Sequence, residues 1–180
     1  MASVVFLKGV NVGGHRTFRP SVLANRMARH GVVNIGAAGT FIVRKPINQA
    51  KLRLELRRYL PFETEAMICS ANDILRLASV PCFDGEACGP DTVRFVSVLS
   101  KRPRVLPVLP LELPASKDWL IRLVAIQGRF AFGLYRHVGR TIGSFSQLEK
   151  RLGASLTTRN WNTFSSLFET LRNHNVGKCR

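Results

Sequence analysis

Short apolar runs alternate with stripes at helical spacing along the first eighty residues. Runs of four or five mainly apolar residues predict buried strands, whereas apolar residues three and four apart predict helices that bury one face. In chain order these patterns predict a strand at 4–7, a helix at 20–31, strands at 32–35 and 40–43, a helix at 48–60 and a strand at 65–69. This βαββαβ order is that of a ferredoxin-like unit.

Residues that start and stop helices lie at the expected ends of these elements. Pro20 can be a first helical residue, because its φ is fixed and its missing amide would have no partner there. Gly31 can end that helix in a left-handed conformation. Asn48 is expected to cap the second helix, and Asn72 a short third helix.

The pattern returns in the second half of the chain. It predicts strands at 93–99, 119–126, 129–135 and 156–158, and a helix that opens with a capping box at Ser144 and stops at Gly153. Residues 107–114 hold three prolines, so a turn or one short helical segment is expected there. The order is again close to βαββαβ, which predicts an internal duplication of fold.

A final helix is expected to open near Thr158. Its apolar stripe is formed by Trp161, Phe164, Leu167, Phe168 and Leu171. The sequence therefore predicts an α+β protein with two ferredoxin-like subdomains in tandem, at 1–80 and 93–158. An acidic linker at 81–92 joins them, and a C-terminal helix and tail follow at 159–180.

Size and composition are typical of a globular protein. The chain has 180 residues and is 46% hydrophobic, which is enough for one large or two small cores. No apolar run reaches the eighteen or so residues of a membrane helix, and no secretory leader pattern opens the chain. A cytoplasmic protein without a membrane partner is expected.

Four cysteines and four histidines are scattered along the chain. None of the cysteines forms a CxxC pair, which argues against a zinc site and against a disulfide framework. Cys82 and Cys88 bracket a loop and could pair under oxidation, but free thiols are the preferred interpretation. No carboxylate pair or Ser-His-Asp set is indicated either, so no metal or cofactor is expected and enzymatic activity stays an open question.

Charge is the strongest compositional signal. The chain has 27 Lys and Arg residues against 11 Asp and Glu, a net charge of +16. Eleven cations and one acid fall in residues 1–60, whereas residues 61–93 hold one cation and six acids. Such a field attracts phosphates, nucleic acid or acidic partners. An arginine-rich solvated surface is the equally weighted alternative.

A glycine-rich loop follows the first strand. It reads Lys8-Gly9-Val10-Asn11-Val12-Gly13-Gly14, then His15 and Arg16. It matches neither a P-loop nor a dinucleotide fingerprint. The functional interpretation is a nest of backbone amides that binds an anion, with Lys8, Gly9, Asn11, Gly13 and Gly14 as ligand residues. The modestly favoured alternative is a tight strand-to-helix connection, in which Asn11 tolerates an unusual backbone conformation.

A second polar cluster lies near the C-terminus. If the last helix starts at Thr158, its free amides form an anion site with Thr158, Arg159, Asn160 and Asn162. Alternatively, these side chains hydrogen-bond loop carbonyls, including those of the glycine-rich loop. A ligand held between the two segments requires Asn11 and Arg159 to meet in space.

The two segments together resemble the bacterial family called domain of unknown function 1697. That family typically opens with Arg-Gly-Ile-Asn-Val-Gly-Gly and closes with Thr-x-Arg-Asn-Trp-Asn-Thr; this chain has Lys8–Gly14 and Thr157–Thr163. The resemblance implies two ferredoxin-like subdomains and no established activity. The family's first arginine is Lys8 here, and its hairpin residues Gln-Ser-Gly-Asn are replaced by Ala37-Ala38-Gly39-Thr40.

Two functions follow from these observations. The leading prediction is a non-enzymatic binding module for a phosphate-bearing partner, such as nucleic acid or a nucleotide. The alternative is an enzyme, or a degenerate one, that acts on a small anionic ligand held between the glycine-rich loop and the start of the last helix. In a third possibility both segments only stabilise the fold.

Overall fold

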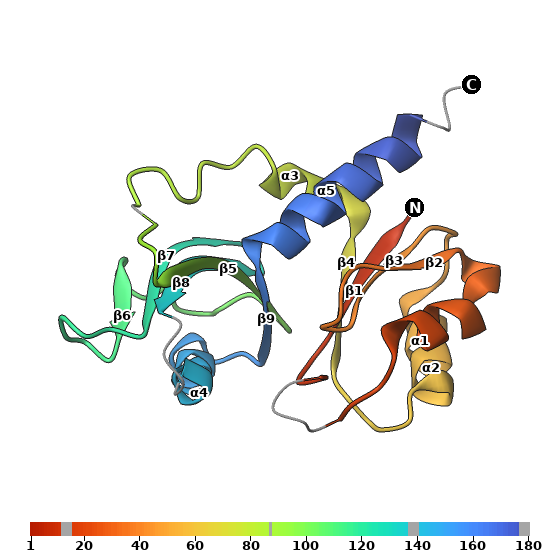
Figure 1. Cartoon of the computed structure of the whole chain (residues 1–180), viewed down its shortest axis with the longest axis horizontal. Helices are drawn as coiled ribbons and strands as arrows, with labels where there is room; N and C mark the ends of the chain where they lie inside the picture. The colour runs from red at the N-terminus through yellow and green to blue at the C-terminus, as the bar shows by residue number, and fades with distance from the viewer. Residues whose placement is uncertain (12–15, 87, 137–140, 177–180) are drawn as a thin grey trace. The chain divides into compact units, whose positions relative to one another are not determined.

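The computed structural model describes residues 1–11, 16–86, 88–136 and 141–176. They form an α+β protein with two antiparallel sheets and a C-terminal helix (Figure 1). The chain divides into two compact units: Met1–Val80 with Thr163–Arg180 form unit 1, and Pro81–Asn162 form unit 2. Residues 81–92, predicted as a linker, therefore lie in unit 2.

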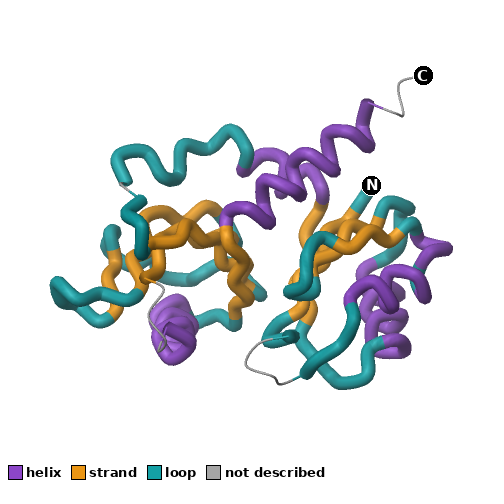
Figure 2. Tube along the Cα trace, viewed as in Figure 1, coloured by secondary structure: helices purple, strands orange, loops and turns teal. Residues whose placement is uncertain are grey.

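Unit 1 contains a four-stranded sheet in the order β2-β3-β1-β4. Its neighbouring strands are antiparallel, and Val5 of the central strand β1 lies between Phe41 and Ile68. The strands are β1 (Ser3–Leu7), β2 (Val32–Asn34), β3 (Thr40–Val43) and β4 (Ala66–Ser70); the helices are α1 (Pro20–Arg26), the short 3-10 helix η1 (Ala28–His30), α2 (Gln49–Tyr59), α3 (Ala71–Leu77) and α5 (Trp161–Val176). The six elements predicted for residues 4–69 are thus all present (Figure 2).

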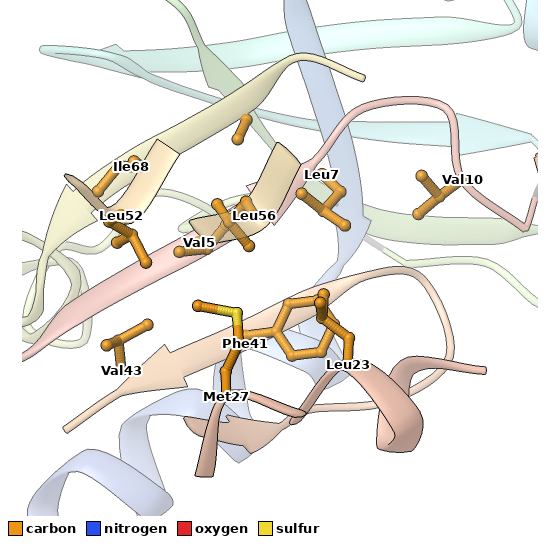
Figure 3. Packing of buried hydrophobic residues seen from close by; sticks show 11 residues of the cluster. Val5, Leu7, Val10, Leu23, Met27, Phe41, Val43, Leu52, Leu56 and Ile68 are labelled. Carbon is orange, nitrogen blue, oxygen red and sulfur yellow. The ribbon is translucent and has the colours of Figure 1, made fainter. Parts of the chain in front are cut away.

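Two apolar layers cover the faces of this sheet. On one face, alternate strand residues pack with α1 and α2 around Leu23, Met27, Leu52 and Leu56 (Figure 3). On the other face, Phe6 of β1 stacks on Phe164 of α5, with ring centroids 5.6 Å apart. Both rings are fully buried, so α5 completes the core of unit 1.

Helix ends in unit 1 follow the predicted chemistry with one correction. The Asn48 side chain accepts a hydrogen bond from the amide of Ala50 at 2.7 Å, and Gly31 has the left-handed φ of 63°. The cap of α3 is Ser70 and not Asn72, because the Ser70 hydroxyl accepts from the amide of Asp73. Ser70 ends β4, so the strand passes into the helix without a loop.

Unit 2 contains a five-stranded sheet in the order β6-β7-β8-β5-β9. The strands are β5 (Thr92–Leu99), β6 (Leu111–Leu113), β7 (Ile121–Gln127), β8 (Phe130–Arg136) and β9 (Leu156–Asn160), and the helix is α4 (Thr141–Leu152). One face packs with Leu148 and Leu152 of α4. On the other, Phe83 lies edge-on to Phe132 and Trp161.

Two predictions for unit 2 were wrong. Residues 111–113 form the edge strand β6 and not a helical segment, because Pro110 and Pro114 lie just outside it and leave the amides of the strand available for pairing with β7. Within the described residues, unit 2 therefore lacks the first helix of a βαββαβ unit. Helix α4 already begins at Thr141, so Ser144 lies buried within the helix and does not cap it.

Candidate functional site

The glycine-rich loop is held tightly to the sheet at its first residues. The amide of Lys8 donates to the carbonyl of Glu65 at 2.9 Å, and the Thr64 hydroxyl donates to the carbonyl of Lys8. Val10 is 1% exposed and packs into the core of unit 1. The loop therefore leaves the strand along a defined path, with its apolar residue inside.

Asn11 holds this loop to the β2–β3 hairpin. Its side-chain amide donates to the carbonyls of Phe18 and Ala37, at 3.1 and 2.7 Å, and its carbonyl oxygen accepts from the amide of Phe18 at 2.9 Å. The backbone has a φ of 54°, a conformation that asparagine tolerates better than most residues. The predicted unusual conformation is confirmed, and all polar side-chain atoms of Asn11 have partners within unit 1.

Of the other residues in this loop, Gly9 and Arg16 lie within the described part of the chain. Gly9 has a φ of 62°, and a Cβ there would lie 3.9 Å from the guanidinium of Arg16. The guanidinium of Arg16 therefore lies beside Gly9. Gly13 and Gly14, both predicted ligand residues, lie outside the described residues. The predicted anion nest stays a prediction.

The second polar cluster is a strand where a helix start was predicted. Thr157, Thr158 and Arg159 pair with Val98, Ser97 and Val96 of β5, and α5 begins only at Trp161. The Thr158 hydroxyl lies 2.7 Å from that of Ser97, so it belongs to a pair across the sheet and not to a helix cap. Asn160, which ends β9, and Asn162, in the first turn of α5, are exposed.

Arg159 is the most deeply buried cation among the described residues, at 6% exposure. Its guanidinium donates to the Thr157 hydroxyl and to the carbonyl of Thr158, both at 2.8 Å. Burial lowers the pKa of Arg159 to about 10, which leaves it charged at neutral pH. These hydrogen bonds satisfy donors of a buried charge, so the fold depends on them.

The two predicted halves of the site lie in different units. Lys8, Gly9 and Asn11 belong to unit 1, whereas Thr158, Arg159, Asn160 and Asn162 belong to unit 2. The structure brings the residues together within each group. A ligand shared by the two groups stays a prediction.

A basic surface on unit 1 was not predicted as a site. Seven exposed cations lie on α1, η1, α2 and the residue before α1, and we call this set the basic helix face: Arg19, Arg26, Arg29, Lys51, Arg53, Arg57 and Arg58. Glu55 is the acid on these helices, and it already pairs with Arg29. The guanidinium of Arg26 lies 3.5 Å from the carbonyl of Tyr59, so the two helices share one surface. These cations come to share a surface only through tertiary packing, which helical spacing alone does not predict.

A cavity of about 340 Å³ lies at the end of α2. Arg53 and Arg57 line it together with Phe62, Glu63 and Glu65. Arg53 donates to the carbonyl of Ala66 at 2.8 Å, which fixes its guanidinium beside β4. The mixture of two cations and two acids gives the cavity no single preference of charge.

A metal-binding cluster is not assembled among the described residues. They contain no group of three His, Cys, Asp or Glu residues that could hold a metal ion. Cys82 and Cys88 are free thiols, and Cys69 is buried in β4. Burial, with the nearby charge of Asp84, raises the pKa of Cys82 to about 11, so this thiol is a poor nucleophile at neutral pH.

Aromatic side chains on the second sheet do not form an exposed stacking platform. Phe130 and Phe132 are 6% and 0% exposed. Tyr135 packs against Phe95 and Phe145. These rings belong to the core, and the described part of that sheet therefore lacks the exposed aromatics with which RNA-recognition modules stack bases.

Comparisons with known proteins support the fold. The chain is similar to the structure of the conserved bacterial protein SP0830 from Streptococcus pneumoniae, with 16% sequence identity over 94% of this chain and 98% of that chain and a TM-score of 0.55. The two share a fold. A similarity at 16% sequence identity gives no information about function. No family model and no curated protein matches the chain, so the resemblance to the domain of unknown function 1697 family stays a prediction. Among the described helices, none combines the length and apolar character of a membrane span.

Proposed function

We propose that the protein binds the phosphate backbone of nucleic acid through the basic helix face of unit 1. The observation that carries this proposal is the occurrence of seven exposed cations on and next to helices α1, η1 and α2, whose one acid, Glu55, is already paired with Arg29. Phosphate contacts by Lys and Arg account for most sequence-independent affinity for nucleic acid.

Repulsion between the cations favours an anionic partner over mere solvation. Arg53 and Arg57 lie four residues apart on α2, and like charges at this spacing destabilise a helix by about 0.2–0.5 kcal/mol. Arg57 and Arg58 in the last turn offset part of this cost through the helix dipole. Glu63 and Glu65, which line the same cavity as Arg53 and Arg57, offset a further part. Phosphates placed along the surface would relieve the rest.

Substitution of three cations tests this proposal. We expect Arg26→Gln/Lys51→Gln/Arg58→Gln to weaken binding of fluorescent single-stranded and duplex oligonucleotides, measured by anisotropy over a salt series. Each lost phosphate contact lowers the slope of log K against log salt by about 0.9 on duplex DNA. The matched control is Arg76→Gln/Lys150→Gln/Arg151→Gln, which removes three exposed cations elsewhere. Equal loss in both triples, or no salt-dependent binding of the wild type, would contradict the proposal.

The structure gives less support to the alternative function, in which a small anionic ligand is held between the glycine-rich loop and the start of the last helix. Asn11 uses its side-chain amide within unit 1, and Arg159 is buried in β9. Both observations favour the possibility that these residues stabilise the fold.

We also propose that both sheets derive from a ferredoxin-like unit. The elements β1–β4 with α1 and α2 follow the βαββαβ order, and unit 2 follows it with β6 where the first helix would be.

A further inference from the structure

Aliphatic side chains gather on one exposed loop of unit 2. Val105, Leu106, Val108 and Leu109, between β5 and β6, are 78%, 64%, 90% and 37% exposed. Among the described residues, only Met1, Val22 and Leu54 are other large hydrophobic residues exposed to this degree. Scattered exposed residues need no explanation, whereas a cluster on one segment marks an interaction site.

Cations immediately precede these aliphatic residues. Lys101, Arg102 and Arg104 are exposed, and none of them forms an ion pair with the described residues. No acid occurs between Ser100 and Leu111. A Cβ on Gly128 would lie 3.8 Å from the guanidinium of Arg102, so the turn between β7 and β8 lies beside this segment.

Prolines make the segment compatible with an apolar environment. Pro103, Pro107 and Pro110 have no amide hydrogen. When the segment moves from water into an apolar environment, fewer backbone amides therefore lose a hydrogen-bond partner. Their fixed φ also lowers the entropy cost of ordering the loop in a complex. The segment thus presents aliphatic side chains and positive charge together.

We propose that residues 101–110 dock on the surface of an anionic lipid bilayer, with the aliphatic side chains of residues 105–109 inserted shallowly and the three cations at the headgroups. Charge complementarity favours this occupant over a second copy of the chain, because each copy carries a net charge of +16 and would repel the other. A basic patch combined with a small apolar insertion is the two-signal arrangement that gives peripheral membrane binding. The sequence-based expectation of no membrane partner rested on the lack of a spanning run, which a surface contact does not need.

Vesicle sedimentation of the full chain tests the proposal. We expect binding to vesicles of phosphatidylglycerol and phosphatidylcholine, little binding to phosphatidylcholine alone, and weaker binding as salt rises. Val105→Ser/Leu106→Ser/Val108→Ser should lower the partition coefficient by at least about tenfold. Lys101→Gln/Arg102→Gln/Arg104→Gln should lower it by a similar factor.

Matched variants distinguish a specific contribution of residues 101–110 from a general effect of positive charge or of exposed apolar side chains on vesicle binding. Val22→Ser/Leu54→Ser removes exposed aliphatic residues of unit 1 and should leave vesicle binding unchanged. The helix-face triple Arg26→Gln/Lys51→Gln/Arg58→Gln should keep most of it, whatever its effect on oligonucleotide binding. If Val105→Ser/Leu106→Ser/Val108→Ser bound anionic vesicles as well as the wild type, the proposal would be overturned, because binding would then depend only on nonspecific electrostatic attraction. No binding of the wild type to anionic vesicles would overturn it in favour of a protein partner.

Discussion

At the scale of single residues, the glycine-rich loop depends on close contact with the hairpin that Asn11 reaches. Gly39 of that hairpin has a φ of 71°, and its carbonyl accepts from the amide of Leu7. A Cβ at this position would lie 2.5 Å from Cγ2 of Val10 and 3.1 Å from Cβ of Leu7. The hairpin and the loop can therefore approach one another only if this residue has no side chain.

Gly39→Ala is expected to destabilise the protein by about 2–4 kcal/mol, because it combines an unfavourable φ with overpacking of the core. Gly36→Ala is the matched control: Gly36 has a similar φ of 76° but open space around it, so its cost should be only about 1–2 kcal/mol. Urea unfolding of both variants measures the difference. Equal losses would show that the contact with Val10 contributes nothing.

Arg159 gives the second prediction at this scale. A ligand residue can be replaced without loss of stability, whereas a buried arginine that binds neighbouring oxygens cannot. We expect Arg159→Ala to lower the free energy of unfolding by about 2–4 kcal/mol. Arg151→Ala, an exposed arginine on α4, should change it by less than about 0.5 kcal/mol. An unchanged thermal midpoint for Arg159→Ala would favour a binding role.

At the scale of elements, apolar runs, periodicity and caps predicted the strands and helices of unit 1 because β1, β3 and β4 are short, almost wholly buried apolar runs, whereas α1 and α2 each bury one apolar stripe. Failures occurred where a local signal had two readings. Ser70 and Asn72 are both capping residues, and which one caps α3 depends on where β4 ends. Residues 111–113 form a strand only because β7 offers an edge, a tertiary contact that no local pattern reveals. Similarly, the strand predicted at 156–158 is confirmed, but it continues through Arg159 and Asn160, which were predicted as the start of a helix, because these residues pair with β5.

The cap of α2 provides a test at this scale. Asn48→Ala should destabilise the protein by about 1 kcal/mol, because the amide of Ala50 loses its acceptor. Asn48→Ser keeps an acceptor oxygen and should remain within a few tenths of a kcal/mol of the wild type. Thermal unfolding followed by circular dichroism measures both. A similar loss in the two variants would assign the effect to something other than the cap.

At the scale of the whole molecule, the sequence predicted the sign of the charge but not its placement. Residues distant in sequence, such as Arg26 and Arg58, become members of one surface only after α1 and α2 pack on the same face of the first sheet. The apolar stripe of α5 was predicted as core, yet helical spacing cannot say which sheet it covers. The stacking of Phe164 on Phe6 shows that it completes unit 1.

Because unit 2 is inserted between two parts of unit 1, synthesis on the ribosome imposes an order on folding. The strands β1–β4 emerge early, but the apolar surface around Phe6 lacks its cover until α5 follows at the end of the chain. Unit 2 is continuous in sequence and can acquire its structure in the meantime. A nascent chain whose residues up to Asn162 have left the ribosome, but whose α5 has not, would therefore present a folded unit 2 behind an incomplete N-terminal sheet, and that sheet is where a chaperone would be expected to bind.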